Sequence, residues 1–207
     1  RYTGSDRWGQ GRAASWRDIA ALCCALDYVV GLRRDGTVVA AGQDTHGRLD
    51  VDSWACVRTV ACSPTHTAAC LLDGGVVCTG NGSRAYEHTD GWKDMTDVAC
   101  GHGFTVGLDS HGGVRMAGGT RRLRERIKRW REVAGLFTDA AGRQVYAVTE
   151  QGTLLSTQRL PRRVKRWENL VYVAADGRRL MGITAAGELL RTDGHRHGRR
   201  GRTASTG

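Results

Sequence analysis

Apolar and polar positions along this chain follow a pattern that returns about every 38 residues. Trp16, Trp54, Trp92, Trp130 and Trp167 follow one another at intervals of 38, 38, 38 and 37 residues. An apolar residue stands three positions after each tryptophan, and another stands six positions after it. The first column holds Ile19, Val57, Met95, Val133 and Leu170, and the second holds Leu22, Val60, Val98, Leu136 and Val173. A fixed period of roughly 20 to 50 residues indicates a repeat architecture.

Within each unit the pattern predicts short β-strands. In the first unit, the apolar runs at 29–32 and 37–39 flank a polar turn that ends in Asp35-Gly36, which is typical of a tight hairpin. Runs in the same place follow at 71–77, 106–114, 148–155 and 183–190, each with a glycine in the turn. We therefore expect three or four strands in each unit.

A single sheet of this size cannot fold alone, because it leaves apolar surface uncovered on both faces. Packing the units face to face around an axis covers those faces, as in a β-propeller. A linear solenoid would need polar caps, and neither end offers one. The prediction is an all-β fold, a β-propeller of about 38-residue blades with five visible units plus an N-terminal partial unit.

We expect the propeller domain to span residues 1–194, with units starting near Trp16, Trp54, Trp92, Trp130 and Trp167. Residues 1–15 form the end of a preceding or closing blade, and as a closing segment they would add the outer strand to the last unit. Residues 195–207 are rich in Arg, Gly, His and Ser, which predicts a basic, disordered tail.

The repeat also carries a family motif. It reads Trp92-Lys93-Asp94-Met95, then Phe104-Thr105-Val106-Gly107-Leu108, with the spaced glycines of Gly42-Gln43-Asp44-Thr45-His46-Gly47. This motif resembles the repeats of the regulator of chromosome condensation family, in its short-bladed bacterial form. The resemblance covers nearly the whole chain to about residue 194 and implies a β-propeller. It implies no single function, because that family includes a nucleotide exchange factor, a photoreceptor and a β-lactamase inhibitor protein.

The charge is concentrated in three segments, 118–131, 158–166 and 191–202. They hold 17 of the 31 Lys and Arg residues against only Glu125 and Asp193, a net charge of +15, so the rest of the +10 chain carries −5. The segments fall in the same part of successive units, so a propeller would place them side by side. The expected partner-binding residues are Arg121, Arg122, Arg124, Arg126, Lys128, Arg129, Arg162, Arg163, Lys165 and Arg166.

Two other interpretations of these segments stay open. Leu123, Ile127 and Trp130 have helical spacing, so 120–131 can equally be read as an amphipathic helix with a solvated basic face. Ile127 and Val164 also stand in the column of Val51, three residues before tryptophan, which favours an ordinary loop anchor. Basic loops can also serve solubility alone.

Cysteine and histidine positions do not indicate a metal or cofactor site. Seven cysteines without a C-x-x-C pair argue against a disulfide framework and favour a reducing, cytoplasmic location. Cys24, Cys62 and Cys100 share one column, and equivalent positions on adjacent sheets are expected ~10 Å apart, too far for a disulfide or shared zinc. We interpret this column as small core positions. His66 stands in the column of Tyr28 and Phe104, which predicts packing and a hydrogen bond.

The functional expectation is a non-catalytic interaction module without cofactor. No nucleophile with a base, phosphate loop or paired-acid motif is visible, and the longest apolar stretch, 19–26, is far too short for a membrane span. The expected partner is a protein with an acidic surface, bound through the loop face. The alternative is nucleic-acid or chromosome-associated binding through the Arg-rich loops. Exchange-factor activity on a small GTPase is a less favoured alternative that rests on the resemblance alone.

Overall fold

The computed structural model describes residues 6–81, 83–139, 141–176 and 179–192 and consists of five three-stranded antiparallel sheets. Each sheet is a meander of three consecutive strands. The strands are β1 (Ile19–Cys24), β2 (Tyr28–Arg33), β3 (Val38–Gly42), β4 (Val57–Cys62), β5 (His66–Leu71), β6 (Val76–Gly80), β7 (Met95–Gly101), β8 (Phe104–Asp109), β9 (Val114–Gly118), β10 (Val133–Thr138), β11 (Val145–Thr149), β12 (Leu154–Ser156), β13 (Leu170–Asp176), β14 (Arg179–Thr184) and β15 (Leu189–Arg191).

Short helices lie in the connections between sheets. They are η1 (Gln10–Ser15), α1 (Ser83–Tyr86), η2 (Thr89–Gly91), α2 (Arg121–Ile127) and η3 (Val164–Arg166). Of the helices in the described ranges, none has the length and apolar character that crossing a membrane requires.

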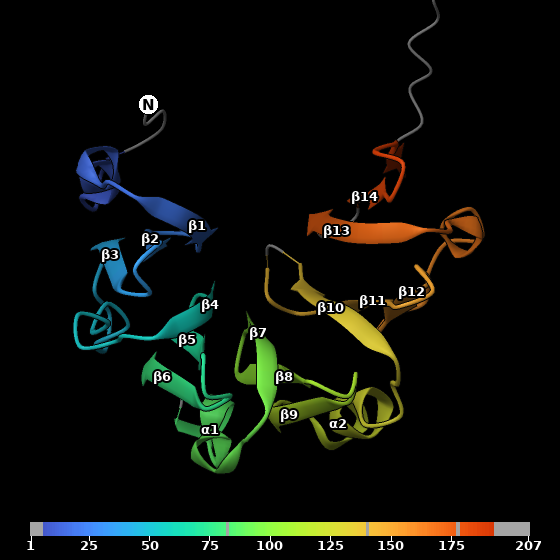
Figure 1. Cartoon of the computed structure of the whole chain (residues 1–207), viewed down its shortest axis with the longest axis horizontal. Helices are drawn as coiled ribbons and strands as arrows, with labels where there is room; N and C mark the ends of the chain where they lie inside the picture. The colour runs from blue at the N-terminus through green and yellow to red at the C-terminus, as the bar shows by residue number, and fades with distance from the viewer. Residues whose placement is uncertain (1–5, 82, 140, 177–178, 193–207) are drawn as a thin grey trace, which may run out of the picture.

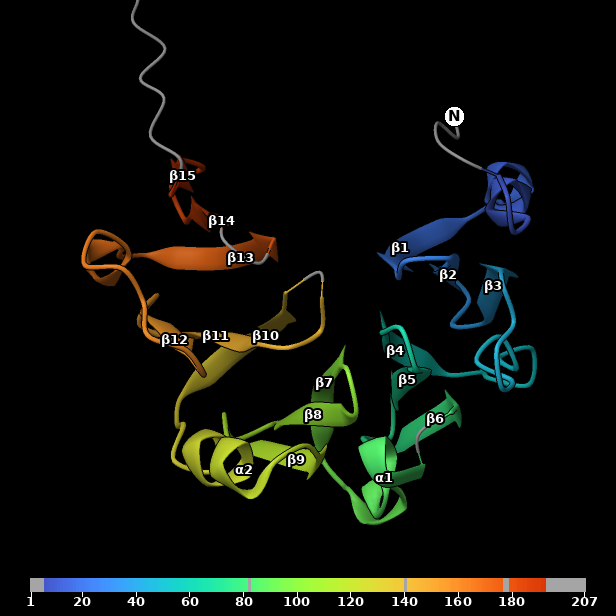
Figure 2. The ribbon, with the colours of Figure 1, turned by 180° about the vertical axis from the view of Figure 1, so that it is seen from behind.

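The five sheets are arranged about a common axis, with the first and fifth sheets at the two ends of an arc (Figures 1 and 2). The first strand of each sheet, β1, β4, β7, β10 or β13, lies nearest the axis, and each of these strands contacts its neighbour in the series. Each unit contributes one sheet, as the 38-residue period predicts. The predicted all-β, blade-type propeller fold is therefore confirmed.

The tryptophan of the repeat packs over a small residue in the middle strand of its own sheet. A Cβ added to Gly107 would lie 2.6 Å from the Trp92 ring, and Gly31 and Gly182 lie similarly close to Trp16 and Trp167. Trp92 belongs to the buried cluster that joins the second and third sheets. Packing of the tryptophan on this small residue thus attaches the connection before a sheet to that sheet.

A hydrogen bond joins each hairpin turn to the next sheet. The amide of Val57 donates to the carbonyl of Gly36 (3.0 Å), and Met95, Val133 and Leu170 donate in the same way to Gly74, Gly112 and Gly152 (3.0–3.1 Å). The residue before each donor has positive φ; these residues are Cys56, Asp94, Glu132 and Asn169, and Asp18 is their counterpart in the first unit. This backbone kink aims the donor amide at the preceding turn.

Polar side chains also connect neighbouring sheets within the core. The hydroxyl of Tyr28 donates to the carbonyl of Ser63 (2.9 Å) on the second sheet, and Nε2 of the buried His66 lies 2.8 Å from Oγ1 of Thr105 on the third. Burial lowers the pKa of His66 to about 4. The predicted packing role of His66, with a hydrogen bond, is confirmed.

The described part of the N-terminal segment, residues 6–15, packs on the first sheet. Helix η1 contacts β2 and β3 of the first sheet, much as α1 contacts β8 and β9. In the described part of the chain, residues 6–15 form no strand, and the fifth sheet consists of β13, β14 and β15 alone. The segment therefore acts as the connection that precedes Trp16. The predicted tail, residues 195–207, lies outside the described residues.

We predict that Trp92→Ala lowers the free energy of unfolding by about 3–5 kcal/mol, because a large buried side chain is removed from the contact with Gly107. Urea denaturation followed by tryptophan fluorescence measures the change. Trp8, whose side chain is exposed, supplies the matched control, and Trp8→Ala should change stability by no more than about 0.5 kcal/mol. Equal effects of the two substitutions would contradict the packing described here.

The buried His66 predicts a pH dependence of stability. Its folded pKa of about 4 lies below the ordinary value, so the unfolded chain binds this proton more readily and stability is lost as pH falls between about 6.5 and 4. The His66 contribution to this loss is about 2 kcal/mol between pH 7 and pH 5. His66→Phe, the residue type of Phe104, should remove that part of the dependence. Denaturant titrations of both proteins at the two pH values test this, and parallel losses would contradict it.

Candidate partner-binding surface

Helix α2 forms the first half of the predicted basic surface. The Thr120 hydroxyl accepts a hydrogen bond from the Leu123 amide (3.2 Å), which caps the helix N-terminus. Ile127 is fully buried, and Leu123 packs against the same core cluster. The two interpretations of this segment are therefore compatible. The segment forms an amphipathic helix, and Ile127 of that helix is also the buried anchor of the connection.

The second half is the turn that contains η3. Val164 is fully buried, as are Val51 and Ile127 in the same column of the repeat. The Val164 amide donates to the carbonyl of Pro161 (3.0 Å), which closes the turn. Burial of this one apolar residue leaves the flanking basic residues, Arg162, Arg163, Lys165 and Arg166, exposed to solvent.

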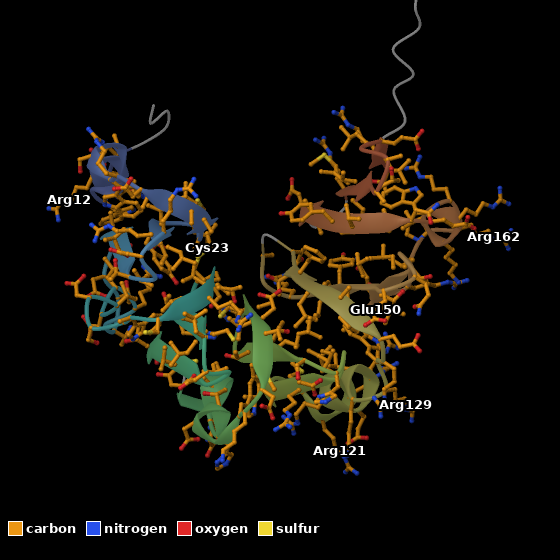
Figure 3. The ribbon with its side chains drawn as sticks, viewed as in Figure 1. Arg12, Cys23, Arg121, Arg129, Glu150 and Arg162 are labelled. Carbon is orange, nitrogen blue, oxygen red and sulfur yellow. The ribbon has the colours of Figure 1, made fainter. Side chains whose placement is uncertain are left out.

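All ten predicted partner-binding residues are exposed. Arg126 extends toward the second group, because its guanidinium donates to the carbonyl of Thr157, the residue just before the second segment. Figure 3 shows Arg121, Arg129 and Arg162 pointing outward from neighbouring parts of the outer rim. We call these ten residues of α2 and the η3 turn the basic surface: Arg121, Arg122, Arg124, Arg126, Lys128, Arg129, Arg162, Arg163, Lys165 and Arg166.

The positive charge of the basic surface has little local compensation. None of its ten side chains forms an ion pair with any carboxylate in the part of the chain that the structure describes. Arg124 donates to the carbonyls of Gly118 and Gly119 (both 2.8 Å), bonds that leave its charge unneutralised. Glu125 is the single acid within these two groups, so the surface presents concentrated positive charge to solvent.

Only the first two residues of the third basic segment, 191–202, lie within the described residues. Arg191 is exposed at the end of β15, whereas residues 193–202 of that segment lie outside the described residues.

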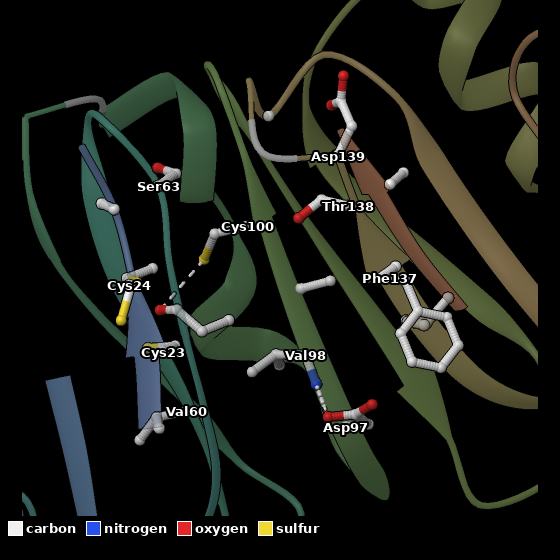
Figure 4. A pocket seen from close by; sticks show the side chains of 18 of the residues that line it. Cys23, Cys24, Val60, Ser63, Asp97, Val98, Cys100, Phe137, Thr138 and Asp139 are labelled. Atoms are coloured by element: carbon white, nitrogen blue, oxygen red, sulfur yellow. Dashed lines mark hydrogen bonds between the residues drawn. The ribbon is translucent and has the colours of Figure 1, made fainter. Parts of the chain in front are cut away.

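A cavity of about 430 Å³ lies where the innermost strands of all five sheets meet (Figure 4). Its polar lining includes Asp97, Asp139 and four cysteines, and burial raises the pKa of Asp97. No histidine, lysine or arginine is among its lining residues, and no group of three metal-ligating side chains occurs within the described ranges.

The cysteines of the shared column contact neighbouring groups near the axis. Sγ of Cys100 lies 3.6 Å from the carbonyl oxygen of Ala61 on the adjacent sheet, and the thiol of Cys62 is hydrogen-bonded with Cys23. This contact and burial hold the pKa of Cys62 well above its ordinary value. Cys24, Cys62 and Cys100 are all free thiols, and they are exposed, partly buried and buried, respectively. Sequence reasoning missed Cys23, although its place beside Cys24 was visible.

Comparison with known proteins supports the fold. No family model matches the chain, and no curated protein matches its sequence. Among solved structures, the ectodomain of receptor kinase CR4 from Physcomitrella patens is 12% identical over 84% of this chain and 49% of that one, with a TM-score of 0.64. Prp20p of Saccharomyces cerevisiae, the yeast RCC1, is 14% identical over 84% of this chain and 56% of that one, with a TM-score of 0.60.

Human WBSCR16 is also similar, with 17% identity over 76% of this chain and 56% of that one and a TM-score of 0.58. The chain thus spans about half the length of these proteins. At such low identity the likeness concerns the fold alone. Together with the five meander sheets, it places this chain among all-β, RCC1-like propeller folds.

Proposed function

We propose that this protein is a non-catalytic interaction module that binds an acidic protein surface through its basic surface. The observation that carries the proposal is the set of ten exposed basic residues from two successive connections, with Arg126 of the first bonded to Thr157 just before the second segment. The two connections are successive in the repeat, which supports binding of one partner by both groups of charges. Location in the cytoplasm, where thiols stay reduced, is part of the proposal and agrees with seven free thiols.

Eight of the ten residues are arginines. A guanidinium group forms paired hydrogen bonds with a carboxylate or a phosphate, so it suits a fixed acidic site better than lysine does. Yeast RCC1, which is similar in fold, was determined bound to Kap60, and Prp20p is described by its binding to Gsp1p and histones. These partners support a protein ligand in general and name none for this chain.

Nucleic acid is the alternative ligand, since phosphates also pair with arginine. The shape of the surface favours protein. Helix α2 has seven residues and is anchored by Ile127, so it is too short and too closely packed on its sheet to enter a DNA groove. Trp130 and Trp167, the aromatic residues that end the two segments, are not exposed and offer no stacking platform for bases.

We predict that reversing Arg121, Arg122, Arg162 and Arg163 to Glu weakens binding of an acidic probe more than about tenfold, because attraction becomes repulsion at four exposed positions. The probe is a fluorescent peptide of aspartates and glutamates, followed by anisotropy. The same reversal at Arg12, Arg17, Arg34 and Arg58, which are exposed on the first two units, is the matched control and should cost far less. Equal losses in the two variants would show that net charge, and not the basic surface, binds the probe.

The choice between protein and nucleic acid is tested by salt. Duplex DNA carries a charge about every 1.7 Å, so six to ten phosphate contacts give a slope of log K against log salt between about −5 and −9. An extended acidic peptide has charges about 3.5 Å apart and condenses fewer ions, so its slope should be shallower. We expect the peptide to stay bound at physiological salt while a DNA duplex is released. Tighter binding of DNA under those conditions would replace the proposal with its alternative.

A further inference from the structure

Two cysteines of neighbouring sheets lie in contact near the axis. Cys23 is in β1 of the first sheet, and Cys62 is in β4 of the second. Strands β1 and β4 contact one another, and both cysteines pack against the buried cluster between these sheets and line the central cavity. The thiol of Cys62 is hydrogen-bonded with Cys23, and both thiols are free. The two sulfur atoms therefore face one another across the interface.

The repeat brings the same two positions together at the next interface. Cys62 stands eight residues after its tryptophan, and Cys23 stands seven residues after the preceding tryptophan. Cys100 and Ala61 hold these positions in the third and second sheets, and Sγ of Cys100 lies 3.6 Å from the carbonyl oxygen of Ala61 (Figure 4). The contact between Cys23 and Cys62 is therefore a feature of the way successive sheets pack.

Only the interface between the first and second sheets has cysteine at both positions. The pairs at the other three interfaces are Ala61 with Cys100, Ala99 with Thr138, and Phe137 with Ala175. Since alanine, threonine or phenylalanine fills these places elsewhere, packing of the repeat does not require a thiol there. What the two facing cysteines add is the capacity to form a covalent bond between the sheets.

We propose that Cys23 and Cys62 are an oxidative modification site, at which hydrogen peroxide converts the two thiols into a disulfide that joins the first and second sheets. One thiolate attacks a peroxide oxygen and the O–O bond breaks, which gives a sulfenic acid and a hydroxide that takes up a proton. The second thiolate attacks the sulfenic sulfur, so the S–S bond forms, the S–O bond breaks and a second water leaves. The two thiols lose two electrons and two protons, and the peroxide gains them.

The surroundings of the pair suit this chemistry. The cavity that both thiols line, of about 430 Å³, has room for hydrogen peroxide, which is little larger than water. The bond would close a loop of about 40 residues and so restrict the unfolded chain, which stabilises the fold. Thiol reductants of the cytoplasm would reverse it. The site involves neither α2 nor the η3 turn, so the proposal stands or fails separately from binding at the basic surface.

The test uses the full chain without its two exposed thiols, as Cys24→Ser combined with Cys56→Ser, because exposed thiols oxidise independently. The reduced protein is treated with hydrogen peroxide until the reaction is complete, since burial raises the pKa of Cys62 and a thiol reacts as its thiolate. Trypsin digestion without reductant should give peptide 18–33 linked to peptide 59–84. The melting temperature should rise by about 5–10 °C and return to its first value after dithiothreitol.

In this background, Cys23→Ala and Cys62→Ala should each remove the link and the rise in melting temperature. Alanine stands at both positions in other units, so both variants should fold, as circular dichroism verifies. Cys78→Ala is the matched control, because Cys78 lies on the same tryptic peptide as Cys62 and Ala40 takes its place in the first sheet. This variant should keep both the link and the rise.

Three outcomes would overturn the proposal. Complete oxidation that leaves peptides 18–33 and 59–84 unlinked shows that the two sulfur atoms do not reach bonding distance. A link that survives in Cys62→Ala assigns the partner of Cys23 to another cysteine. A link that leaves the melting temperature unchanged shows that the bond does not hold the folded sheets together.

Discussion

The arrangement of this molecule depends on a backbone hydrogen bond between the hairpin glycine of one sheet and the first strand of the next. Four such bonds, from Val57, Met95, Val133 and Leu170, set the position of each sheet relative to its predecessor. The bonds need a donor amide turned out of its own strand, which the positive φ of the preceding residue provides. Apolar packing then fills a geometry that the backbone has already defined.

The sheets are joined by the bonds at their hairpin turns and by their buried clusters. The exposed residues of the connections between them can therefore differ in charge without disturbing this packing. Each of these connections has a fully buried anchor, Val51, Ile127 or Val164, and a leucine, Leu49, Leu123 or Leu160, packed against the same cluster. The remaining residues of α2 and the η3 turn carry the arginines without burying any charge. The sheets therefore hold the fold together, while the connections carry the exposed charge.

The fold was largely predictable, because the tryptophan column and the hairpin turns report local packing that every unit repeats. The exposed basic residues were predictable for the same reason, since position in the unit sets their side of the blade. Helix α2 was left open, because Leu123 and Ile127 suit a helix and a loop anchor equally. The contact between Cys23 and Cys62 and the exposure of Leu22 and Ile183 depend on how the sheets are arranged in the arc, which the sequence of a single unit does not report.

The left-handed backbone that follows each tryptophan has a consequence for evolvability. Asp18, Cys56, Asp94, Glu132 and Asn169 all occupy a conformation that costs a residue with a Cβ about 1–2 kcal/mol. Glycine would adopt it with less strain, although part of the gain would be offset by the greater freedom of the unfolded chain. Each unit thus has one position outside its core where a substitution by glycine can raise stability. That gain can compensate for destabilising substitutions elsewhere in the chain.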